Sequence, residues 1–216
     1  MHQATAFALS TILATAAFAG GTLDASLFGA FPDDGKDDTL AVRAALTQAK
    51  KQGAAKLVFP KGRYDFYPDK AFERYQFISN NDEGLKRIVF PLDGMKGFEI
   101  DGQGADFLFH GYLSPVTVDN CRDIVLRNFT VDYERTFHSE GKILAVTNTY
   151  ADVEIATNYP YSVENGILKF HDGKPGKERT LYPVRGLLEF DPVKRETAYQ
   201  ARDYWLGDEE IGRAHV

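Results

Sequence analysis

Residues 97–135 read GFEIDGQGADFLFHGYLSPVTVDNCRDIVLRNFTVDYER, and this stretch decides the fold. It contains two similar apolar runs, Phe98–Gly102 and Ile124–Asn128, whose first residues are 26 positions apart. A small polar turn precedes each run, and a second short apolar run follows each, at Phe107–Phe109 and at Phe129–Val131. Short strands and polar corners that recur at a period in the twenties are typical of stacked solenoid coils. The stretch therefore predicts two successive coils.

The segment before these coils predicts one amphipathic helix over Leu40–Lys51. Its apolar residues recur at helical spacing on one face, at Val42, Ala45, Leu46 and Ala49. Asp37-Asp38-Thr39 supplies an N-cap cluster, and Gly53 supplies the stop. At the start of a solenoid, such a helix would cover the open end of the first coil and block association of its strand edges.

Two short strands, Lys56–Phe59 and Tyr64–Phe66, are expected after the helix, followed by a long loop over Tyr67–Glu83 and a strand at Arg87–Leu92. The succession of D-D-G-K-D-D-T, the helix and V-F-P-K-G-x-Y resembles the N-terminal segment of right-handed parallel β-helix proteins. Polysaccharide lyases and polygalacturonase-like hydrolases share that segment. The resemblance implies an all-β, pectin-lyase-like parallel β-helix with an N-terminal capping helix.

The pattern changes after Arg135, where the coil repeat is lost. Short strands are expected at Ile143–Thr147, Val153–Ala156, Ile167–Phe170, Thr180–Val184 and Leu187–Phe190. Some of them alternate apolar and polar residues, which is typical of antiparallel sheets with one wet face. We therefore expect the cap and first coils in residues 20–140, and the start of an inserted antiparallel β-barrel in residues 141–210.

The two ends of the sequence differ from the rest. Residues 1–19 contain no Asp, Glu, Lys or Arg, and Ala17-Phe18-Ala19 fits an A-x-A cleavage site. This resembles a secretory signal peptide, so the protein is expected to be exported, to the periplasm or the medium. The last six residues, 211–216, fit no preceding pattern and match one reading frame of a common sequencing adapter. They are interpreted as a non-native tail on a truncated read.

Composition excludes several classes of function. The chain of 216 residues has a net charge of -6 and only isolated pairs of basic residues, which argues against nucleic-acid binding. No other apolar run approaches membrane-spanning length. The single cysteine, Cys121, allows no intrachain disulfide and is expected to be a small buried residue. No pairing of His or Cys suggests a metal.

The candidate site lies at the end of the second coil. Asp132 and Glu134 should point to the same side of an extended segment, with Arg135 beside them. Asp132, Glu134 and Arg135 are candidates for contact with substrate, and the carboxylate pair could do acid–base work. A solvated strand end and a junction to the inserted domain are competing interpretations. His110 is expected to be a hydrogen-bonded structural residue rather than a catalytic one.

Four segments together resemble glycoside hydrolase family 110, the α-1,3-galactosidases related to blood-group B cleaving enzymes. They are Phe77–Asn80, Asp101–Gly111, Leu126–Arg135 and Tyr159–Leu168. The resemblance implies an exo-acting enzyme that removes terminal α-1,3-linked galactose from galactose-terminated glycans, with inversion and without a cofactor. No position matches the family's catalytic aspartates, which are expected beyond residue 216. This chain by itself should therefore be inactive.

Two alternatives remain open at this point. One is another β-helix carbohydrate enzyme, either a polygalacturonase-like hydrolase or a lyase. Paired aspartates on successive coils would favour a hydrolase, whereas acidic Ca²⁺-binding clusters with a Lys or Arg base would favour a lyase. The other is a non-catalytic glycan-binding β-helix protein, which is expected if no facing carboxylates occur in further coils.

Overall fold

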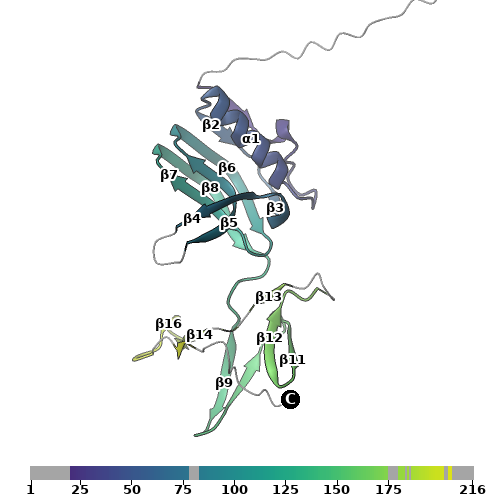
Figure 1. Cartoon of the computed structure of the whole chain (residues 1–216), viewed down its shortest axis with the longest axis vertical. Coiled ribbons are helices and arrows are strands. Elements are labelled where there is room, and N and C mark those ends of the chain that lie inside the picture. Colours follow the sequence, from purple (N-terminus) through teal and green to yellow (C-terminus); the bar gives the residue numbers. More distant parts are fainter. Residues whose placement is uncertain are drawn as a thin grey trace, which may run out of the picture. The chain divides into compact units, whose positions relative to one another are not determined.

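The computed structural model describes residues 20–77, 83–174, 180–182, 184, 186–201 and 204–205 (Figure 1). The chain divides into two compact units, Met1–Glu134 and Arg135–Val216, called unit 1 and unit 2 below. The boundary expected from the sequence lies between residues 140 and 141. The expected signal peptide, residues 1–19, and the expected tail, residues 211–216, lie outside the described residues.

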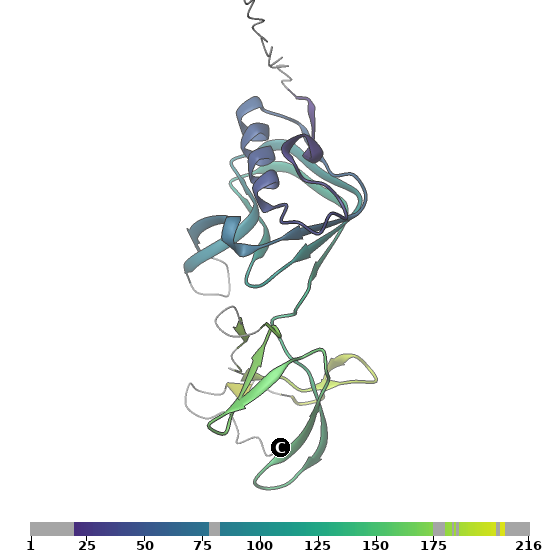
Figure 2. The ribbon, with the colours of Figure 1, turned by 90° about the vertical axis from the view of Figure 1, so that its right-hand side faces the viewer.

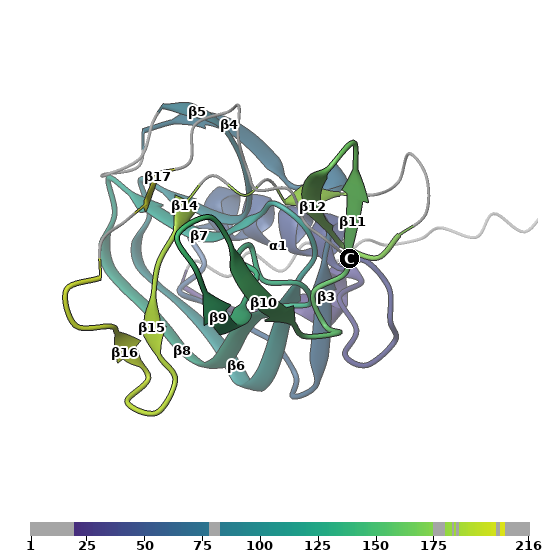
Figure 3. The same ribbon diagram turned by 90° about the horizontal axis from the view of Figure 1, so that it is seen from below.

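The main sheet of unit 1 is built from parallel strands. Its members are β1 (Thr22–Asp24), β2 (Lys56–Val58), β3 (Arg63–Phe66), β6 (Lys96–Phe109) and β8 (Arg122–Tyr133). The first half of β6 lies between β2 and β8, and its second half lies between β3 and β8. β6 and β8 run side by side along their whole length (Figure 3). The chain therefore turns repeatedly, and later strands lie parallel to and beside earlier strands of the same sheet.

A second sheet of unit 1 contains three strands, β4 (Phe72–Gln76), β5 (Gly84–Asp93) and β7 (Ser114–Asp119). β5 and β7 are parallel, whereas β4 is antiparallel to β5. The prediction of a long loop over Tyr67–Glu83 is therefore wrong at Phe72–Gln76, which is a strand, and at Pro68–Lys70, which is a short 3-10 helix. Side chains along β4 alternate between half-buried and exposed, rather than between buried and exposed, so the sequence of β4 shows only a weak apolar pattern.

The predicted helix is present as α1 (Thr39–Gln52), and it lies against β1, β2 and β5 of unit 1 (Figure 2). The predicted inner face is buried, and Gly53 ends the helix in the left-handed conformation at φ 62°. A second 3-10 helix, Ala25–Phe28, packs against α1. The predicted cap is only partly right. Asp37 accepts the Thr39 N–H, but Asp38 makes no capping hydrogen bond and is turned toward β3 instead.

The coil repeat has the predicted register over its first half. Phe98 pairs with Ile124 and Asp101 pairs with Arg127, as the 26-residue offset requires. The register then shifts, because three residues separate Asp101 from Ala105 in β6 while only Asn128 separates their partners in β8. The second apolar runs therefore pair as Phe107 with Val131. The runs Phe107–Phe109 and Phe129–Val131 are therefore offset by two residues.

Gly102 sits at this corner because the next coil passes very close to it. A Cβ atom at Gly102 would lie 2.5 Å from the Phe129 Cβ and 2.8 Å from the Asn128 carbonyl oxygen. We expect Gly102→Ala to lower the free energy of unfolding by about 1–3 kcal/mol, because the backbone must shift to relieve the overlap. Urea-induced unfolding of the two proteins measures the difference.

Gly84→Ala is the matched control for that substitution. Gly84 also lies in a strand of unit 1, and the nearest atom to its Cβ position would be the Lys86 Nζ, 3.7 Å away. The control should change the free energy of unfolding by less than about 1 kcal/mol. Equal effects of the two substitutions would show that the close approach at the corner does not matter.

The described strands of unit 2 form small antiparallel sheets. β9 (Gly141–Val146) pairs with β10 (Ala151–Ile155), and β11 (Tyr161–Glu164), β12 (Ile167–His171) and β13 (Leu181–Tyr182) form a three-stranded sheet. Two further pairs are β14 (Gly186–Leu187) with β17 (Tyr204–Trp205) and β15 (Phe190–Asp191) with β16 (Glu196–Thr197). The sequence Glu164-Asn165-Gly166 predicts a turn, and the structure has this turn between β11 and β12, with Asn165 and Gly166 both at positive φ.

The fold is mostly β, as predicted, with a parallel unit followed by an antiparallel one. In the part of unit 2 that the structure describes, the strands form separate sheets, and these do not close into a barrel. Among the described residues, no helix has the length and apolar character needed to cross a membrane.

Candidate functional site

Three coil ends of unit 1 lie in register beside one another. Phe66 of β3 pairs with Phe109 of β6, and Phe109 pairs in turn with Tyr133 of β8. The backbone pattern continues one residue further, because His110 N donates to Phe66 O at 2.9 Å and Glu134 N donates to Phe109 O at 3.1 Å. The residues that follow these strands, among them His110 and Glu134, are therefore brought to neighbouring levels of one column.

His110 is buried at the centre of this column. Its Nε2 lies 2.7 Å from Oδ1 of Asp65, and its Nδ1 lies 2.6 Å from Oε2 of Glu134. The ring of Tyr67 stacks flat on the imidazole, with 4.1 Å between ring centroids and 4° between planes. The interpretation of His110 as a hydrogen-bonded residue is confirmed. Both of its carboxylate partners were missed, although Glu134 was singled out for another reason.

Asp65 is the buried end of the cluster. Arg63 donates to it from Nε and from Nη2, the latter at 2.6 Å, and the Asp65 backbone N–H donates to Oδ2 of Asp38 at 3.1 Å. Burial by itself would raise the pKa of Asp65, but the hydrogen bonds from Arg63 and His110 outweigh it and hold that pKa below its usual value. Asp65 is therefore a carboxylate at neutral pH.

The two predicted carboxylates have different surroundings. Glu134 is oriented by His110, although 59% of its side chain is exposed. Asp132 is exposed, and its Oδ1 accepts the N–H of the following Tyr133 at 2.7 Å. The structure thus brings Glu134 into the cluster of Asp65 and His110 and leaves Asp132 on the surface beside it. A contact of either carboxylate with substrate stays a prediction.

The third predicted residue, Arg135, is the first residue of unit 2 and is buried there. Its guanidinium lies 4.9 Å from the ring centroid of Tyr159 and 4.6 Å from that of Tyr182, a cation–π arrangement on two faces. It also donates to the His138 carbonyl at 2.8 Å and to Ser139 Oγ at 2.6 Å. The interpretation as a solvated strand end is therefore wrong for Arg135, which is a packing residue of unit 2.

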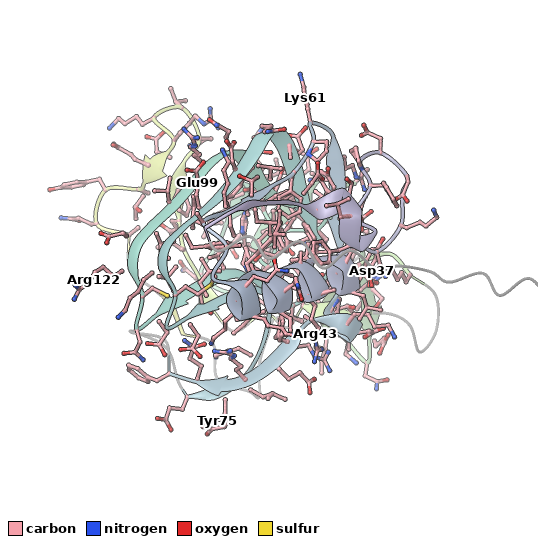
Figure 4. All side chains as sticks on the ribbon, turned by 90° about the horizontal axis from the view of Figure 1, so that it is seen from above. Asp37, Arg43, Lys61, Tyr75, Glu99 and Arg122 are labelled. Atoms are coloured by element: carbon pink, nitrogen blue, oxygen red, sulfur yellow. The ribbon has the colours of Figure 1, made fainter. Side chains whose placement is uncertain are left out.

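A second charged cluster crosses the parallel strands of unit 1. Lys56 of β2 contacts Glu99 and Asp101 of β6 at 2.9 and 2.7 Å, and Arg127 of β8 contacts Glu99 at 2.7 Å. Figure 4 labels Glu99 on this stack of strands. Hydrogen bonds from Lys56, and then from Asn128 and the Gln103 N–H, hold the pKa of Asp101 well below its usual range. Both carboxylates are thus engaged by cations, which indicates a structural cross-link.

A groove of about 310 Å³ lies between α1 and the β4–β5 pair. Its described lining is apolar and basic, and includes Phe72, Met95, Lys50 and Arg74 but no carboxylate. It therefore offers no carboxyl group for acid–base chemistry. Cys121 is half-buried rather than buried, and its thiol donates to the Asp119 carbonyl at 3.2 Å. The described residues contain no group of three or more His, Cys, Asp or Glu side chains placed to hold a metal ion.

Comparison with known proteins gives two kinds of match. Residues 139–214 match the family model described as GLAA-B beta-barrel domain I. Most of the chain is similar to proteins named alpha-1,3-galactosidase. It is 43% identical over 178 residues to alpha-1,3-galactosidase A of Shewanella woodyi, and 39% identical over 206 residues to an alpha-1,3-galactosidase B of Phocaeicola vulgatus. It is 34% identical over 172 residues to alpha-1,3-galactosidase B of Bacteroides thetaiotaomicron.

These matches cover most of this chain but a small part of each relative. The aligned regions are 82%, 92% and 79% of this chain, and 29%, 33% and 27% of the three relatives in the same order. The chain therefore spans about a third or less of the length of the curated relatives that it matches.

Proposed function

Because the chain belongs by sequence to the family of the alpha-1,3-galactosidases A and B, we propose that it is part of an exo-acting glycoside hydrolase. The substrates are glycans that end in α-1,3-linked galactose, and the reaction inverts the anomeric configuration. The observation that carries the proposal is the similarity to three such proteins over about four-fifths or more of this chain.

The finer fold proposal is a right-handed parallel β-helix. Its support is the parallel order β1-β2-β6-β8 in one sheet and the parallel pair β5-β7 in another. A further support comes from β8, whose pairing partner among the described strands is β6. Its apolar residues Val125, Leu126 and Val131 are 45%, 38% and 45% exposed. In a β-helix, apolar side chains at such an edge are covered by the next coil. The match to a β-barrel domain supports the inserted barrel.

Hydrolysis needs two carboxyl groups with free oxygens, separated by about 6.5–9.5 Å if the reaction inverts. Two buried carboxylates of unit 1 are engaged already, since Asp65 binds Arg63 and His110, and Asp101 binds Lys56. We propose that the catalytic pair lies outside these 216 residues, as the resemblance to the α-1,3-galactosidases implies. The role of this chain is then to begin the β-helix, and the protein works after export, where such glycans occur.

The activity of the chain itself tests this assignment. Purified protein is incubated with a disaccharide that ends in α-1,3-linked galactose, and the released galactose is measured against the Shewanella woodyi relative as a positive control. We expect no release above background, because the catalytic pair is absent. Clear turnover would overturn the placement of the catalytic groups. For a longer form of the protein, no release would overturn the proposed function, and initial release of α-galactose would overturn inversion.

A further inference from the structure

In the cluster of Asp65, His110 and Glu134, the two carboxylates need two N–H donors, one more than a neutral histidine ring has. Both ring nitrogens face carboxylate oxygens, at 2.7 Å for Asp65 and 2.6 Å for Glu134. A neutral imidazole has one N–H and one lone pair, so it can donate to only one of these oxygens. At the other nitrogen, a lone pair would face a carboxylate oxygen at hydrogen-bond distance, which is repulsive. The geometry therefore requires one additional proton in the cluster.

The surroundings decide which part of the cluster can move. Asp65 is held by two donors of Arg63 and through its N–H by Asp38, and its carboxylate is buried. His110 is held between Asp65 and the stacked ring of Tyr67. By contrast, the Glu134 side chain is 59% exposed, so water can replace its contact with His110. Two further carboxyl groups bear on this cluster: Asp37 adds to the negative potential felt at Tyr67, and Asp38 interacts unfavourably with the charge of Asp65.

We propose that Asp65, His110 and Glu134 form a proton-dependent clamp that fixes the end of β8. With the additional proton, the ring donates to both carboxylates and Glu134 is held. When that proton is lost, the ring keeps its N–H toward Asp65, and the Glu134 carboxylate turns out into water. The backbone bond from Glu134 N to Phe109 O then loses its side-chain support, and the last residues of unit 1 become mobile.

The sign of the pH dependence follows from the extra proton. The clamp is present at mildly acidic pH and is lost as pH rises, because the folded protein binds a proton that the open state does not. Asp65 adds a separate pH dependence in acid. Because its pKa is lowered, the stabilising contribution of the Asp65 carboxylate is lost only as pH falls below the usual carboxyl range. The measurements run from about pH 5 to about pH 9, where Asp65 stays charged. They are repeated in Asp38→Asn, because burial raises the pKa of Asp38, which bonds to the Asp65 N–H, to about 7.

Glu134→Gln and Asp132→Asn form a matched pair for the test. A glutamine can accept from a protonated ring or donate to a neutral one, so it stays bound to His110 at any pH. Asp132 is the neighbouring exposed carboxylate, and it bonds to the backbone of Tyr133 instead. For the full chain, NMR gives the protonation of the His110 ring nitrogens and the hydrogen-exchange protection factor of the Glu134 amide in each protein.

In the unmodified chain and in Asp132→Asn, we expect the protection factor of residue 134 to fall on the order of tenfold as His110 loses a ring proton. In Glu134→Gln, it should change less than about twofold. The proposal is overturned if all three proteins show the same pH response, or if the protection factor of the unmodified chain is constant while the His110 ring titrates.

Discussion

Phe107→Ala should lower the free energy of unfolding of unit 1 by about 3–5 kcal/mol, the effect expected for a large aromatic residue in a close-packed core. Phe107 is 2% exposed. Its ring centroid lies between 4.8 and 5.9 Å from those of five other aromatic rings, which belong to Phe59, Tyr64, Phe66, Phe90 and Phe129. These rings come from both sheets and from consecutive coils, so they cannot all move inward to fill the cavity that Phe107→Ala would leave.

The effect is a large part of the stability of a small domain, which is commonly about 5–15 kcal/mol in total. Urea-induced unfolding followed by far-UV circular dichroism measures it, and hydrogen exchange of β2 and β6 assigns the loss to unit 1. Tyr75→Ala is the control, because Tyr75 projects from β4 and is 72% exposed (Figure 4). The control should stay within about 0.5 kcal/mol. A Phe107→Ala variant as stable as the control would show that the aromatic rings around Phe107 are not the core of unit 1.

The repeat and the helix could be predicted because their signals are local. The apolar face of α1 and the paired runs that begin at Phe98 and Ile124 each fit within one element or one pair of coils. The turn at Asn165-Gly166 was equally local, because these residues adopt positive φ at little cost. In each case the residues that determine the structure are close together in the sequence.

The prediction failed where distant segments decide the outcome. The two-residue shift between Asp101 and Ala105 depends on how tightly Phe129 packs on Gly102, and no pattern in one segment contains that contact. β4 was missed because its side chains are half-buried on one face and charged or exposed on the other.

The candidate site shows the same limit more sharply. His110 and Asp65 are 45 residues apart, and they meet because Phe66 pairs with Phe109. Once that register is known, residues 64–67, 107–110 and 131–134 align as successive coil ends, and the column becomes visible in the sequence. Glu134 was found through its neighbour Asp132, whereas its actual partner lies one coil away.

Asp38 should make unit 1 less stable as pH rises from about 4 to about 8. Its side chain is buried, and burial raises its pKa from 3.8 to about 7 against the opposing effect of two backbone donors, Asp65 N–H and Phe31 N–H. The folded state therefore binds a proton that the unfolded state releases near its ordinary pKa. The stabilising contribution is complete below pH 3.8 and is lost as pH rises through about 7.

The size of this loss has an upper limit. Each unit of difference in pKa corresponds to about 1.4 kcal/mol, so a pKa raised from 3.8 to about 7 corresponds to at most about 4 kcal/mol. Asp38→Asn removes the titration. It should also cost about 1–3 kcal/mol at every pH, because an amide accepts from only one of the two N–H groups that bond the carboxyl group. The variant is thus less stable than the unmodified chain at acidic pH, and the difference narrows as pH rises.

The measurement is the free energy of unfolding in urea at several values between about pH 4 and about pH 8. Asp69→Asn serves as the control, because Asp69 is an exposed carboxylate at the start of a short 3-10 helix in the same unit. We expect the control to follow the unmodified chain and Asp38→Asn to show a shallower slope. If Asp38→Asn keeps the full slope, the decline comes from other groups, of which the cluster around His110 is the first to examine, and Asp38 is ionised throughout.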